Sequence, residues 1–178
     1  MQFTLIDRIL ELAPGRRIVA VKNLTLAEEY LAEHFPGFPV MPGVLMLEAI
    51  TQASAWLIRI TEDYAHSVLV LKSVKAVRYG SFVTPGRQLA IEAEITKASA
   101  SETELRAKGA VDGVSTVSGR ITMHGYNLRD REPCLESLDH DMVAALRRQF
   151  ALLARQWTRA NDKINGPFVD RLASVVTA

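Results

Sequence analysis

The sequence predicts an α+β fold, because one long apolar helical segment stands beside several runs of alternating apolar and polar residues. The 178 residues, 48% of them hydrophobic and 23% charged, are enough for one domain with a sizeable core. The helix should begin at Gly43, with Pro42 at its first turn, and its apolar character on all sides predicts that it is surrounded. An antiparallel sheet wrapped round it would cover both the helix and the apolar face of the sheet.

Five runs with the two-residue period of half-buried strands predict this sheet. Pro14-Gly15 precedes the run that we expect to be the first strand, and Pro85-Gly86 and Asp112-Gly113 mark later turns. Because the later runs are separated by short segments, we expect an antiparallel meander. The runs are Arg17–Asn23, Ser67–Tyr79, Gln88–Thr96, Thr103–Val111 and Ser115–His124.

Two further segments complete the organisation of the chain. His34–Pro42 contains three prolines, which lack an N–H and restrict their neighbours, so we expect a rigid irregular loop. From Leu138 to Trp157 apolar residues recur at steps of three and four, which predicts an amphipathic helix. After Asn161 the signals are weak, and we expect a loosely docked tail. We therefore assign residues 1–130 to the core domain and residues 131–178 to a C-terminal helical extension.

Composition excludes several classes of function. The formal net charge of +1 indicates neither a nucleic-acid partner nor binding to a membrane surface. Cys134 is the single cysteine and cannot form an internal disulfide, and the N-terminus has acidic residues where a signal peptide needs basic ones, so we expect a cytoplasmic protein. The apolar helix is interrupted by polar residues and is shorter than a bilayer span, so we expect a core helix. The four histidines and one cysteine form no metal-ligand cluster.

His34 and Glu48 are the candidate acid–base residues. A histidine that opens a stiff loop has a fixed side chain and a pKa suited to proton transfer, although a packed or exposed loop histidine fits the same pattern. Glu48 lies in an apolar helix, where burial would raise the pKa of its carboxyl group and make it a general acid. The neutral Gln52, one turn further on, can orient it. The alternative is that Glu48 is exposed and solvated.

Gly43 lies where the loop meets the helix. Free N–H groups in the first turn of a helix stabilise negative charge, so this turn can hold a thioester oxygen as it gains enolate character. Glycine also permits close approach of a ligand. A plain helix-entry glycine, present for conformational reasons, remains the alternative.

The combined pattern resembles a known enzyme family. HFPGFPVMPGVL at His34–Leu45, followed by Glu48-Ala49 and Gln52-Ala53, resembles the signature of the 3-hydroxyacyl-[acyl-carrier-protein] dehydratases of the FabZ branch. The resemblance extends from about Phe3 to His124 and includes LIDRILELAPGRRIVAVKN and VTPGRQLAIEAEI. It implies the hot-dog fold, in which a sheet wraps one long helix.

The resemblance also implies a mechanism and an assembly. His34 would remove the α-proton of a (3R)-3-hydroxyacyl thioester and Glu48 would protonate the departing hydroxyl, giving a trans-2-enoyl thioester. The Gly43 N–H would bind the thioester carbonyl, and the Val40 carbonyl would orient the His34 ring. No metal or redox cofactor is implied. The related FabA branch, which also isomerises the double bond, carries Asp at the position of Glu48, so the glutamate favours dehydration alone.

In this family the histidine and the glutamate of one site come from different protomers, so a homodimer with shared active sites is implied. Assembly of the dimers into a trimer of dimers stays open. The substrate would be carried on acyl carrier protein or coenzyme A. In this family, basic residues near the mouth of the substrate tunnel attract the acidic carrier. The candidates here are Lys72, Lys75, Arg78 and Arg87. Each of them can equally be a solvated surface charge.

Two other functions and the use of the extension are left open. A hot-dog acyl-thioesterase would share the fold, but such enzymes generally lack the proline-rich loop. A non-catalytic subunit that binds acyl chains or the carrier would not need His34 and Glu48. The presence of both residues therefore argues against this alternative. The extension, which short family members lack, is expected to pack on the domain, with joining of protomers and carrier docking as the alternatives.

Overall fold

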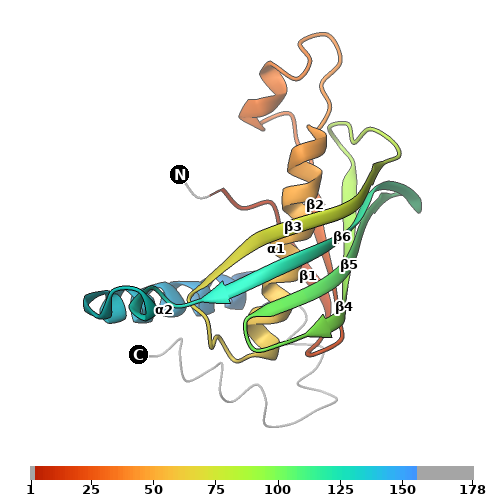
Figure 1. The fold of residues 1–178 in the computed structure, drawn as a ribbon. Helices are drawn as coiled ribbons and strands as arrows, with labels where there is room; N and C mark the ends of the chain where they lie inside the picture. Colours follow the sequence, from red (N-terminus) through yellow and green to blue (C-terminus); the bar gives the residue numbers. More distant parts are fainter. Residues whose placement is uncertain (1–2, 156–178) are drawn as a thin grey trace.

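The computed structural model describes residues 3–155, in which a six-stranded antiparallel sheet curves round one long helix (Figure 1). The strand order is β1-β2-β4-β5-β6-β3, and the predicted α+β hot-dog architecture is confirmed. The strands are β1 (Arg8–Ala13), β2 (Arg17–Asn23), β3 (Val68–Tyr79), β4 (Gln88–Ala98), β5 (Glu102–Val111) and β6 (Val114–Tyr126). The helices are α1 (Gly43–Thr61), α2 (Glu136–Leu153) and the short 3-10 helices η1 (Glu29–Ala32), η2 (Leu128–Asp130) and η3 (Pro133–Leu135).

Helix α1 lies in the hollow of the sheet and has one apolar face against it. Ile50, Ala53 and Leu57 on that face are 0% exposed. The opposite face is only partly covered within one chain, because a single curved sheet reaches round part of a helix. Val44 is 69% exposed and Glu48 is half-buried, so the expectation of a fully surrounded helix is wrong for one protomer. By length and composition α1 could cross a bilayer, yet most of it is buried inside the fold.

The N-terminal strand pair differs from the prediction. Arg17–Asn23 is not the first strand, because β1 precedes it as its hairpin partner across the Pro14-Gly15 turn. The register of β1 shifts between Ile9 and Glu11, and this bulge interrupts the two-residue period that would have revealed the strand. Gly15 has a φ of 73°, which explains a glycine at the turn.

The predicted meander is right for β4, β5 and β6 only. Strand β3 pairs with β6 at one edge of the sheet, and β2 occupies the place beside β4. The helix explains the difference, because the chain crosses the hollow as α1 between β2 and β3 and so reaches the far edge of the sheet.

Helix α2 packs against α1 and closes one end of the hollow. Phe150 is 0% exposed, and its ring lies 6.0 Å from the ring of Trp56 on α1. The expectation that the extension packs on the domain therefore agrees with the structure, and the boundary near residue 130 stays a prediction. The predicted helix is present up to Leu153, while Trp157 and the tail after Asn161 lie outside the described residues.

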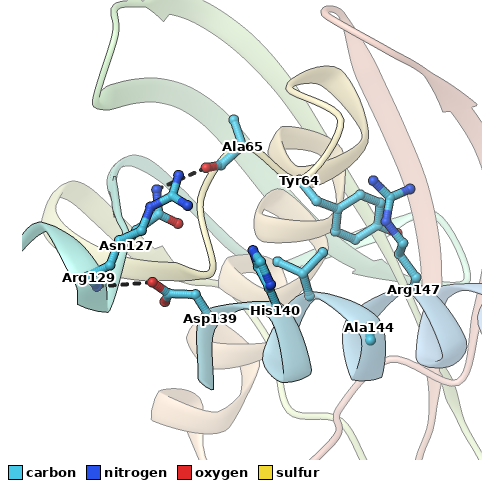
Figure 2. Close-up of a pocket in the computed structure, with 9 residues that line it drawn as sticks. Tyr64, Ala65, Asn127, Arg129, Asp139, His140, Ala144 and Arg147 are labelled. Carbon is cyan, nitrogen blue, oxygen red and sulfur yellow. Dashed lines mark hydrogen bonds between the residues drawn. The ribbon is translucent and has the colours of Figure 1, made fainter. Parts of the chain in front are cut away.

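Asp139 anchors the start of α2. Its buried carboxylate accepts hydrogen bonds from the Ser67 hydroxyl and from Leu128 N at 2.9 Å. It also accepts one from Arg129 N at 3.0 Å (Figure 2). Burial by itself raises the pKa of Asp139, but these hydrogen bonds and the nearby Arg129 charge bring it below its usual range. The carboxylate thus ties α2 to the loop before β3 and to η2.

We expect Asp139→Asn to lower the thermal unfolding temperature at neutral pH, because one amide oxygen cannot replace both carboxylate oxygens. A pKa lowered by folding contributes stability that is present above the unfolded-state pKa and is lost as the pH falls through the folded-state value. The gap between wild type and Asp139→Asn should therefore narrow in acid, as followed by circular dichroism. Asp141→Asn, at an exposed position of the same helix, is the control. If the difference in unfolding temperature between wild type and Asp139→Asn widened in acid, the anchoring role assigned to the Asp139 carboxylate would be contradicted.

Candidate active site

The loop that begins at His34 is held by its own backbone. Phe35 and Phe38 exchange two backbone hydrogen bonds of 3.2 and 2.9 Å, and Val40 N donates to the His34 carbonyl at 3.0 Å. Met41 N donates to the Val83 carbonyl at 2.9 Å, which ties the loop to the segment after β3. The expected rigid, irregular loop is therefore present.

The His34 ring is oriented by the Val40 carbonyl. Nδ1 of His34 lies 3.0 Å from that oxygen. Because a carbonyl oxygen only accepts, the contact requires a proton on Nδ1 and leaves Nε2 of the neutral ring with its free lone pair. A half-buried histidine in this tautomer is suited to accept a proton through Nε2.

Glu48 is held in place by Gln52, as its position one turn away suggested. The Gln52 amide nitrogen donates to Glu48 Oε1 at 2.9 Å and to the Phe3 carbonyl at 3.1 Å. The amide oxygen of Gln52 accepts from Leu5 N at 2.8 Å. Gln52 thereby fixes one carboxylate oxygen and joins the N-terminal segment to α1, while Glu48 keeps a second oxygen for a ligand.

Glu48 lines a groove of about 290 Å³ on the face of α1 that the sheet leaves uncovered. Strands β3 and β6 contribute Leu69 and Met123 to one side, and α2 contributes Leu146 and Gln149. Half-enclosed clefts of this kind suit a small organic group. The side chains of α1 that line it are Glu48, Thr51, Gln52, Ala55, Trp56 and Arg59.

Gly43 begins α1, as predicted, with Pro42 as the residue before it. No side chain caps this helix end, and the Pro42 carbonyl accepts from Leu45 N at 2.9 Å and Met46 N at 3.1 Å. The N–H groups of the first turn have no partner within a helix, so they can bind an anionic oxygen. A Cβ at Gly43 would lie 3.0 Å from the Tyr79 ring, so a side chain at this position would have to displace that ring.

The structure does not bring His34 and Glu48 together within one chain. His34 is absent from the described side chains that line the Glu48 groove, and no contact joins the two residues within residues 3–155. The two halves of the predicted site are therefore each formed, but separately.

The four carrier-binding candidates separate into two kinds. Lys72 contacts the Glu102 carboxylate, and Arg87 contacts Asp112 at 2.6 Å, so both have partners. Lys75 and Arg78 are exposed on the outer face of β3. There they belong to a basic cluster around a shallow depression of about 300 Å³. The cluster could not be predicted from the sequence, because its residues come from different strands. Its members are Lys75, Arg78, Arg106, Lys108 and Arg120.

A larger cavity, of about 470 Å³, lies between α2 and the turn after α1 (Figure 2). Its two arginines already have carboxylate partners, since Arg129 contacts Glu136 at 3.1 Å and Arg147 contacts Asp63 at 3.0 Å. Arg147 also lies over the Tyr64 ring, 4.3 Å from its centroid. These contacts serve packing of α2, and size alone does not make this cavity the active site.

Comparison with known proteins agrees with the fold. Two curated relatives are FabZ 3-hydroxyacyl-[acyl-carrier-protein] dehydratases. The one from Ruminiclostridium cellulolyticum is 38% identical over 119 residues, covering 67% of this chain and 84% of that protein. The one from Anaeromyxobacter sp. is 39% identical over 139 residues, covering 73% and 83%.

Solved structures show the same fold at low sequence identity. The dehydratase heterocomplex ApeI:P from Xenorhabdus doucetiae matches with a TM-score of 0.60 and 18% identity, over 75% of this chain and 90% of that one. The protein smu.793 from Streptococcus mutans, bound to acetyl CoA, matches with a TM-score of 0.55 and 14% identity, over 71% and 92%.

The sheet wrapped round α1 makes this a hot-dog protein. A family model described as a FabA-like domain matches residues 1–123. The chain belongs to the FabA-like family. Helix α2 lies beyond the matched residues.

Proposed function

We propose that the chain dehydrates (3R)-3-hydroxyacyl thioesters to trans-2-enoyl thioesters in fatty-acid or related acyl biosynthesis. The observation that carries the proposal is that one chain presents an oriented histidine, whose Nε2 can accept a proton, and separately an oriented glutamate near the uncapped start of α1. The FabZ relatives, of which the chain covers most of the length, support the same reaction. The intact loop and Glu48 disfavour a thioesterase and a non-catalytic subunit.

The proposed mechanism uses each residue for one task. The Gly43 N–H binds the thioester carbonyl oxygen and stabilises the enolate charge that develops there. Nε2 of His34 accepts the proton from C2, and Glu48 donates a proton to the hydroxyl on C3. The C–O bond breaks, water leaves, and the double bond forms between C2 and C3. Gln52 and Val40 act as positioning residues for Glu48 and His34.

We propose a homodimer with shared sites. The separation of His34 from the Glu48 groove within one chain supports this arrangement, because a second copy can supply the missing half. The exposed Val44, on the open face of α1, is an apolar residue that a partner would cover. The single, exposed Cys134 thiol suits a reducing compartment, and we place the enzyme in the cytoplasm.

We propose that acyl carrier protein docks on the basic cluster of Lys75, Arg78, Arg106, Lys108 and Arg120. Arg106 and Arg120 are directly opposite each other in the sheet, and like charges so placed repel, so an acidic partner would relieve the repulsion. Arg78 immediately precedes Tyr79, whose ring contacts Gly43. A carrier bound here would hold its thioester near the start of α1.

Hydration of a trans-2-enoyl thioester, the reverse reaction, tests the proposed function through loss of the conjugated absorbance. Wild type should be active, and His34→Ala and Glu48→Gln should each lower kcat by roughly 100-fold or more, since each removes one proton-transfer group. Glu62→Gln, at the residue that follows the end of α1 and lies outside the groove, should retain activity. If wild type is inactive, or if both site variants match it, the dehydratase assignment is wrong.

Mixing the two inactive variants tests the shared site. A heterodimer of His34→Ala and Glu48→Gln protomers contains one intact site and one doubly altered site. After co-expression, the mixture should therefore recover about a quarter of the wild-type rate for random pairing, in which half the dimers are heterodimers. Recovery should be absent when the two proteins are assayed separately. No recovery in a verified heterodimer would exclude sites shared across the dimer.

Charge reversal tests the docking surface. Arg78→Glu with Arg120→Glu should raise the KM for carrier-bound substrate by roughly tenfold or more and leave the KM for a pantetheine thioester unchanged, because the small substrate does not need the surface. Lys97→Glu, at an exposed position elsewhere on the sheet, is the matched control. Equal changes for both substrates would place the effect in the active site instead.

A further inference from the structure

The groove that begins at Glu48 runs along α1 to a shielded cation. Glu48 and Arg59 are about three helical turns apart and lie on one face of the helix, with a rise of ~16 Å between them. Both line the groove, and Ala55 lies between them on the same face. At the Arg59 end α2 supplies Leu146 and Gln149 to the wall.

Arg59 differs from Lys22 and Arg147, two other shielded cations, which have carboxylate partners. Lys22 contacts Glu28 at 2.5 Å, and Arg147 contacts Asp63 at 3.0 Å. Within residues 3–155 no carboxylate lies in ion-pair range of Arg59, and its buried Nε has no hydrogen-bond partner there. Burial lowers the pKa of Arg59 to about 10, so the guanidinium remains protonated at neutral pH. Arg59 is half-buried, and a partly desolvated cation without a counterion is costly, so an anionic ligand would offset that cost.

The position of the Arg59 head group is set by aromatic packing. Its guanidinium carbon lies 5.2 Å from the centroid of the Trp56 ring, a cation–π contact. Trp56 is 4% exposed and packs against Phe150 of α2. Gln149 donates one amide hydrogen to Thr4 Oγ1 at 3.2 Å and has a second hydrogen to offer. The end of the groove thus combines a fixed cation with an amide donor.

The proposed chemistry gives the acyl chain a direction in this groove. With the thioester carbonyl at Gly43 and the 3-hydroxyl at Glu48, carbons from C1 to C3 run from the start of α1 into the helix. The same direction leads the rest of the acyl group past Ala55 to Arg59. The far end of the substrate therefore meets a positive charge.

We propose that the preferred substrates are 3-hydroxyacyl thioesters whose far end carries a carboxylate, which Arg59 binds at its end of the groove. A methyl end would leave the guanidinium desolvated and unpaired. Gln149 comes from the helix that lies beyond the FabA-like match, so the extension contributes to this selectivity. The inference rests on the proposed dehydratase function.

The test compares pairs of trans-2-enoyl pantetheine thioesters of equal length that end in a methyl group or a carboxylate. Over a series of lengths, wild type should hydrate the carboxylate-ended member with the higher kcat/KM at the length that reaches Arg59. Arg59→Met should lower kcat/KM for that substrate by roughly 10- to 100-fold and spare the methyl-ended one. Arg59→Lys should keep part of the preference. Arg148→Met, at an exposed arginine of α2, should behave as wild type.

Wild-type selectivity decides the question even where a variant fails to fold. A preference for methyl-ended substrates at every length would overturn the inference and leave the dehydratase function standing. An equal loss on both substrates in Arg59→Met would assign Arg59 a structural role, and would also overturn it. Hydration of neither substrate by wild type would overturn the proposed function itself, and this inference with it.

Discussion

Burial of one face of α1 against the sheet fixes the rotation of the helix and, with it, the positions of the groups in the candidate site. Each fully buried Leu or Ile contributes roughly 1.5–3 kcal/mol, whereas a buried carboxylate without partners would cost several kcal/mol. Ile50 and Leu57 therefore face the sheet, and Glu48 must face away from it. The same rotation of the helix places Gln52 and Arg59 beside Glu48 on the open face. Packing thus creates the groove and determines which polar groups line it.

The open face is organised by polar contacts that connect segments distant in sequence. Gln52 alone joins Glu48 to the N-terminal backbone at Phe3 and Leu5. At the other end of the groove, Trp56 connects Arg59 to Phe150 of α2. The extension is consequently part of the groove wall, and its anchoring affects the shape of the substrate site as well as stability.

Much of the architecture could be predicted, because local periodicity reports which face of a segment is buried. The helix from Gly43, the strands β2 to β6, and the amphipathic α2 all follow from that signal. Strand β1 was missed because a bulge near Leu10 breaks its alternation. Pairing of β3 with β6 was also missed, because alternation identifies a strand but does not specify its neighbour. That neighbour depends on the path of the chain across α1.

Local sequence was enough to predict the stiff loop from His34, the start of α1 at Gly43, and the adjacency of Glu48 and Gln52, because each depends on residues within a few positions of one another. The resemblance carried by the same residues indicated the family. Tertiary packing leaves one face of α1 open, keeps His34 and Glu48 apart within one chain, and places Arg59 and Gln149 in the lining of one groove. These features arise from contacts between distant segments, which periodicity and spacing do not encode.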